Sequence, residues 1–155
     1  MIREVCAAGY EHYEISNFCR PGSESRHNTK YWKREPYYGF GNSAHSHDGA
    51  RRRWTNQRDA IRYVEVIEGG ESPIVERNEL SEEDARSEAI FLGLRLMRGI
   101  DLIDYRARFG TDLREIFNGE IDRLQAGGLI EITDGVLKLT GRGALLSNEV
   151  MASAL

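Results

Sequence analysis

The chain has 155 residues, of which 40% are hydrophobic and 30% are charged, and its formal net charge is −4. This composition is typical of an ordinary globular protein and argues against a disordered tail. No run approaches the roughly 18 apolar residues that a membrane helix needs, and no signal peptide is recognisable, so we expect no membrane insertion and a cytoplasmic location.

The first region, residues 1–56, is rich in aromatic residues, glycine, histidine and asparagine and has little helical periodicity. Its segment His12–Phe18 is predicted to form one strand, and the sequence Arg20-Pro21-Gly22-Ser23 is predicted to end that strand in a turn. Two glycines in the stretch Tyr37–Ser46 suit a backbone that must come close to another group. A bulged strand or a tight packing site is the alternative for that stretch.

Residues 57–78 are predicted to form a connecting helix and a linker. The helix is expected at 57–68, with Ile61, Val64 and Ile67 on one face, and Gly69-Gly70 is expected to end it. The Pro-containing segment 71–79 is predicted to be the linker and the best domain boundary.

Residues 79–155 are predicted to form a second domain that begins with a helix capped by Ser81. Two shorter helices are expected at about 101–109 and 112–126. Asp134-Gly135 between alternating apolar residues predicts a β-hairpin, and a closing helix is expected at about 142–154. Three helices, a hairpin and a last helix are the order of a winged-helix fold, so the expected fold class is α+β with a winged-helix-like C-terminal domain.

The predicted winged helix is not expected to bind DNA. Its helix 112–126, in the position of a recognition helix, carries four acidic and two basic residues, a formal charge of −2. A DNA duplex would repel such a surface, because affinity for nucleic acid comes largely from neutralising phosphates. Packing against protein is the favoured alternative.

Several motifs follow one another in a fixed order with tight spacing. They are Tyr13-Glu14-Ile15-Ser16-Asn17-Phe18, Arg20-Pro21-Gly22, Glu24-Ser25-Arg26-His27-Asn28, Tyr31-Trp32, Gly39-Phe40-Gly41, Ala44-His45-Ser46, Gly93-Leu94-Arg95-Leu96, Gly99-Ile100-Asp101-Leu102 and Leu139–Asn148. This order resembles the radical S-adenosylmethionine (SAM) family of oxygen-independent coproporphyrinogen III oxidases in porphyrin biosynthesis. The pattern from His27 to Trp32 resembles the HemW branch of that family, the haem chaperones.

The resemblance implies that residues 1–56 are the C-terminal remnant of a radical SAM barrel and that residues 79–155 are a HemN-type C-terminal domain. The family binds a 4Fe–4S cluster through Cys-x3-Cys-x2-Cys, and S-adenosylmethionine completes its coordination. This chain has only Cys6 and Cys19, which are expected to be free thiols. The chain alone is therefore not expected to bind the cluster or to be an enzyme.

The implied partner is a separate N-terminal radical SAM half, with self-association as the alternative. The remnant of an open barrel would expose an unpaired strand edge and apolar surface, and both invite a partner.

The resemblance implies haem binding in the pattern His27, Asn28, Tyr31 and Trp32. An imidazole is a common axial ligand of haem iron, so His27 is the candidate ligand, while Tyr31 and Trp32 could pack on the porphyrin face. In the alternative, Arg26-His27-Asn28 caps a short helix and the two aromatic residues pack in the core.

The stretch around Ala44 and His45 resembles the segment that touches S-adenosylmethionine in the intact family. His45 and His47 alone are short of a zinc site, so no metal site is expected. The run Arg51-Arg52-Arg53 could meet haem propionates or a partner, and a solvated turn is the favoured alternative.

Overall fold

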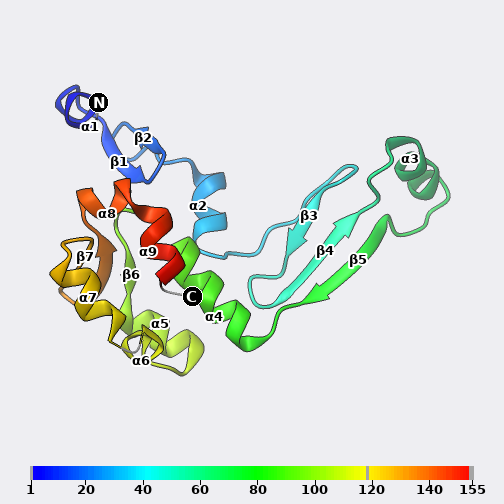
Figure 1. Cartoon of the computed structure of the whole chain (residues 1–155). Helices are drawn as coiled ribbons and strands as arrows, with labels where there is room; N and C mark the ends of the chain where they lie inside the picture. The colour runs from blue at the N-terminus through cyan, green and yellow to red at the C-terminus, as the bar shows by residue number, and fades with distance from the viewer. Residues whose placement is uncertain (1, 118, 154–155) are drawn as a thin grey trace. The chain divides into compact units, whose positions relative to one another are not determined.

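Figure 1 shows the computed structural model, which describes residues 2–117 and 119–153. The chain forms two compact units, Met1–Lys33 with Arg86–Leu155, and Arg34–Ala85. The first unit contains helices and two small antiparallel sheets, and the second contains a helix and one antiparallel sheet, so the predicted α+β class is confirmed. The boundaries expected near residues 56 and 78 stay a prediction.

The first unit holds most of the helices. Its elements are α1 (Ile2–Ala7), β1 (Glu11–Glu14), β2 (Asn17–Cys19), α2 (Arg26–Trp32), most of α4 (Glu82–Gly93), β6 (Ile100–Asp101), α5 (Leu102–Phe109), α6 (Leu113–Phe117), α7 (Glu120–Ala126), β7 (Ile130–Thr133), β8 (Val136–Leu139), α8 (Gly141–Leu145) and α9 (Ser147–Ser153). One core, to which α4 to α7, the strands β7 and β8, and α9 contribute, stabilises it by removing apolar surface from water. Its fully buried members are Ile90, Leu94, Leu113, Leu137 and Val150.

The predicted hairpin of this unit is confirmed, and it is part of a three-stranded sheet. β7 pairs with β8 across Asp134 and Gly135, whose φ angles of 52° and 79° match the two left-handed positions of a type I′ turn. β6 adds to the other side of β8, which gives the order β6-β8-β7.

The single strand predicted for His12–Phe18 is wrong, because the segment folds back on itself as the β1–β2 hairpin. The cause is local: the Glu14 carboxylate accepts hydrogen bonds from the Ser16 backbone N–H and from the Asn17 amide, and these bonds hold the turn. The turn after β2 is confirmed, with the Ser23 N–H donating to the Arg20 carbonyl at 2.9 Å.

The helix predicted at 112–126 is wrong as one element, since α6 and α7 are separate. Gly119 has a φ of 88° in the left-handed region, where an α-helix cannot continue; residue 118 lies outside the described residues. The closing helix is likewise divided into α8 and α9, and residue 154 of the predicted range is also outside the described residues. α5 agrees with the prediction, and the Ser81 side chain accepts from the Asp84 N–H as expected of a helix cap.

The second unit consists of β3 (His45–His47), β4 (Arg52–Asn56), α3 (Ala60–Glu68) and β5 (Ile74–Glu79). Its sheet has the antiparallel order β3-β4-β5 (Figure 1). The prediction of a linker at 71–79 is wrong for residues 74–79, because β5 pairs with β4 from Ile74 to Glu79. α3 lies within the predicted range and ends, as predicted, at Gly69.

No helix among the described residues is long and apolar enough to cross a membrane.

Candidate functional site

α2 carries the four residues predicted to bind haem. The helix begins after Ser25, whose hydroxyl accepts a hydrogen bond from the Asn28 N–H at 3.3 Å. The N-cap is therefore Ser25, and not the triplet Arg26-His27-Asn28 of the alternative prediction. Asn28 is half-buried at the first turn.

His27 and Tyr31 lie on one face of α2, because residues four apart are neighbours on a helix surface. Their ring centroids are 4.9 Å apart and the planes stand at 89°, an edge-to-face contact. His27 is exposed and Tyr31 is half-buried. An exposed imidazole beside an aromatic ring can coordinate an iron atom that approaches from solvent.

Trp32 has a different environment from these two residues. The Arg95 guanidinium lies over its ring, 4.3 Å from the centroid. A cation at this distance is attracted by the electron-rich face of the indole. One face of Trp32 is therefore covered by Arg95, as in the packing alternative.

Arg95 links Trp32 to Glu14, and the sequence motifs predicted no role for either charged residue. The Arg95 guanidinium pairs with the Glu14 carboxylate at 3.4 Å; the Glu14 side chain is 0% exposed and that of Arg95 is 23% exposed. The backbone adds to the link, since the Ile15 N–H donates to the Arg95 carbonyl and the Met97 N–H donates to the Tyr13 carbonyl, both at 3.0 Å. A glutamate inside an apolar strand pattern is the sequence signal that could have indicated a buried partner.

The glycine-rich stretch lies in the second unit and packs against its own backbone. A Cβ at Gly39 would lie 2.3 Å from the His45 carbonyl oxygen, so only glycine fits there. The Asn56 amide donates to the Gly41 carbonyl at 3.0 Å. These contacts favour the tight packing site, which was the alternative prediction for this stretch.

The two histidines of β3 have unlike surroundings. His45 is exposed and its Nδ1 lies 3.1 Å from the Thr55 hydroxyl, whereas His47 is buried with its ring 6.0 Å from that of Tyr37. Ala44 is half-buried, and its carbonyl accepts from the Asn56 N–H at 2.9 Å. No group of three or more His, Cys, Asp or Glu side chains in the described ranges is placed to hold a metal ion.

The two cysteines differ in burial. Cys6 is exposed on α1, whereas Cys19 is buried on β2. Burial raises the pKa of the Cys19 thiol, and the charges of Glu11 and Glu24 raise it further.

In the arginine run, Arg51 pairs with the Glu79 carboxylate at 2.8 Å.

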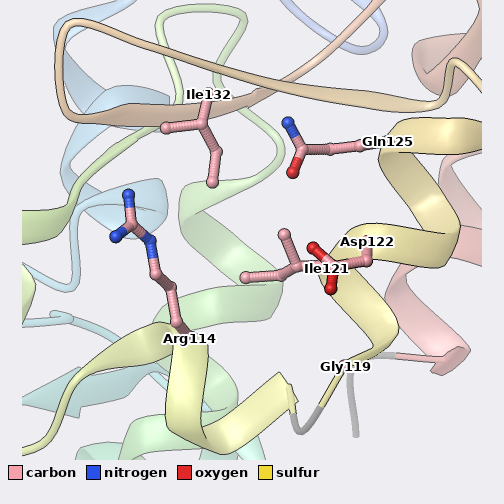
Figure 2. Close-up of a pocket in the computed structure, with 6 residues that line it drawn as sticks. All are labelled: Arg114, Gly119, Ile121, Asp122, Gln125 and Ile132. Atoms are coloured by element: carbon pink, nitrogen blue, oxygen red, sulfur yellow. The ribbon is translucent and has the colours of Figure 1, made fainter.

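A hollow between α6, α7 and β7 lies outside the sites that the sequence predicted. Figure 2 shows the Arg114 and Gln125 side chains directed towards it, with Ile121 and Ile132 between them. Asp122 also lines the hollow, so its charges are mixed.

Residues 80–146 match the family model described as the HemN C-terminal domain. The structure is similar to that of coproporphyrinogen III oxidase HemN from Escherichia coli, a radical SAM enzyme, with a TM-score of 0.71 and 18% identity over 99% of this chain and 38% of that chain. Residues 80–146 are thus similar to the HemN C-terminal domain, and the chain has the fold of the corresponding part of that structure.

The curated relatives include haem chaperones. The haem chaperone HemW of Bacillus subtilis is 36% identical over 100% of this chain and 41% of its own length. HemW of Mycobacterium tuberculosis is 36% identical over 97% of this chain and 36% of its own length. The chain is thus homologous to the C-terminal part of the HemW/HemN proteins, as the motif order predicted, and spans about two fifths of the curated relatives' length.

Proposed function

We propose that this chain acts as the C-terminal part of a HemW-type haem chaperone of the radical SAM family, and that it binds haem as cargo through His27. The observation that carries the proposal is the exposed imidazole of His27 beside Tyr31 on α2. The HemW relatives, matched over nearly the whole chain, support haem as the ligand.

The geometry of α2 fits one axial ligand and one aromatic contact. A ring nitrogen of His27 would coordinate the iron, and Tyr31 would contact the porphyrin edge. Asn28, one residue from the ligand, would offer its amide to a haem propionate. Trp32 has one ring face covered by Arg95, so its contribution is to hold α2 in place.

The cluster of the family does not fit this chain. A 4Fe–4S cluster of the proposed kind needs three thiolates, and the sequence has one exposed and one buried cysteine. The proposed role of this chain therefore has no SAM cleavage step of its own. Ala44 and His45 are proposed to face S-adenosylmethionine only when a cluster-bearing half is joined to them.

Haem titration followed by absorbance tests the proposal. We expect a Soret shift on addition of haem that is lost in His27→Ala. The control is His45→Ala, which removes an exposed histidine that lies outside α2 and should retain the shift. A shift that survives in His27→Ala would exclude His27 as the ligand, and the absence of any shift in the wild type would exclude haem binding by this chain.

A second candidate function is that of an interaction module that docks on a separately encoded, cluster-bearing half. The observation in its favour is the apolar face that α3 leaves exposed. Residues 79–155 are proposed to be winged-helix-like, from the order of α4, β6, α5 to α7, β7 and β8, and to pack on protein. Affinity for a DNA duplex with a steep salt dependence would contradict this role.

A further inference from the structure

The helix α3 has its largest apolar face towards solvent. Ile61, Val64 and Ile67, which we call the α3 stripe, are 73%, 50% and 47% exposed. Their spacing of three residues places them along one side of the helix. The half-buried side of α3 is instead formed by Tyr63 and Val66.

Contacts of Tyr63 fix which side of the helix faces the rest of the second unit. The Tyr63 hydroxyl accepts a hydrogen bond from the Gly41 N–H at 3.3 Å, and the Asn42 amide donates to the Arg58 carbonyl just before α3. α3 is therefore tied to the loop at 39–42 through its Tyr63 side. The α3 stripe remains available to another polypeptide.

We propose that the α3 stripe is the docking face for the remainder of a HemW-type polypeptide, the part that carries the cluster. This inference rests on the second candidate function and names its surface. About three fifths of the Bacillus subtilis relative lies outside the stretch that matches this chain, while the match includes all of α3. In the relatives, the matched stretch is thus joined to a large further polypeptide. The comparison supports that polypeptide as the occupant of the α3 stripe.

The second unit also has an open strand edge. β5, which follows α3, is at the edge of its sheet, and in the part of the chain that the structure describes it pairs with β4 alone. An open strand edge and an exposed apolar helix face are both surfaces that proteins commonly cover with another segment.

The test mixes this chain with the part of the Bacillus subtilis relative that lies outside the matched stretch, and measures their binding by calorimetry. We expect Ile61→Asp to weaken binding at least about tenfold, which corresponds to about 1.4 kcal/mol. Ile103→Asp is the matched control: Ile103 is also the second residue of an Asp-capped helix and is 77% exposed, against 73% for Ile61. We expect the control to bind like the wild type.

A second measurement uses hydrogen exchange in a chimera, in which this chain replaces the matching stretch of that relative. Joining the parts raises their effective concentration to the millimolar range, so α3 amides should exchange at least about tenfold more slowly than in the isolated chain, and Ile61→Asp should restore fast exchange. Three results would each overturn the proposal. They are α3 exchange that is unchanged in the chimera, an equal loss of binding affinity in Ile61→Asp and Ile103→Asp, and a dimer of the isolated chain that Ile61→Asp dissociates. The haem titration does not depend on these binding and exchange measurements, so a failure of haem binding is recognised separately.

Discussion

The buried ion pair between Glu14 and Arg95 offers a sharp test of how the predicted haem helix is held. In Arg95→Met the Glu14 carboxylate, 0% exposed, loses its charged partner. Removing one member of a buried pair costs about 3–5 kcal/mol. The lower end applies here, about 3 kcal/mol, because the carboxylate keeps its hydrogen bonds from the Ser16 N–H and the Asn17 amide.

Urea unfolding followed by circular dichroism measures this loss. With a slope of about 1–3 kcal/mol per molar urea, the midpoint should fall by about 1 M or more. Arg98→Met removes an exposed arginine three residues away and should change the free energy of unfolding by less than about 0.5 kcal/mol.

A conservative variant separates charge from stacking. Arg95→Lys keeps the positive charge opposite Glu14 but loses the planar group over Trp32, and should cost about 1 kcal/mol. An Arg95→Met midpoint equal to that of the wild type, or to that of Arg98→Met, would refute the role assigned to the pair.

Two further predictions concern a glycine and a carboxylate. Gly143→Ala should destabilise the protein by about 3 kcal/mol in the same unfolding assay, because its Cβ would lie 1.8 Å from the Leu129 carbonyl oxygen, whereas Gly141→Ala in the same helix has open space and should change little; similar effects at both positions would contradict this account. Burial raises the pKa of Asp48, but backbone N–H groups of Ala50 and Arg52 and nearby positive charges outweigh burial and leave the pKa below its ordinary value. A carboxyl group with a lowered pKa stabilises the fold above its unfolded-state pKa and loses that contribution as the pH falls through the folded-state pKa, so the stability advantage of the wild type over Asp48→Asn should be full at pH 7 and shrink below about pH 4. An advantage that is constant from pH 7 to pH 3 would contradict it.

The features that the sequence predicts best are those made by neighbouring residues. The turn at Arg20–Ser23, the hairpin at Asp134-Gly135 and the cap at Ser81 each depend on backbone conformations and hydrogen bonds within four residues. Such interactions leave a direct pattern in the sequence.

The errors lie where the partner is elsewhere in the chain or where one residue breaks a pattern. Residues 74–79 look like a polar linker, because five of the six side chains of this edge strand are exposed; only the pairing with β4 makes it a strand. The helix at 112–126 keeps its apolar spacing across Gly119, but the left-handed φ of that glycine divides it.

The candidate site shows the same division within a single motif. The contact between His27 and Tyr31 follows from their spacing on α2 and is local. The surroundings of Trp32 depend on Arg95, which belongs to another motif far along the chain and is itself held by Glu14. A pattern that looks like one haem-binding element in the sequence is thus one helix whose residues have two different environments. His27 is exposed beside the half-buried Tyr31, whereas one ring face of Trp32 is covered by Arg95.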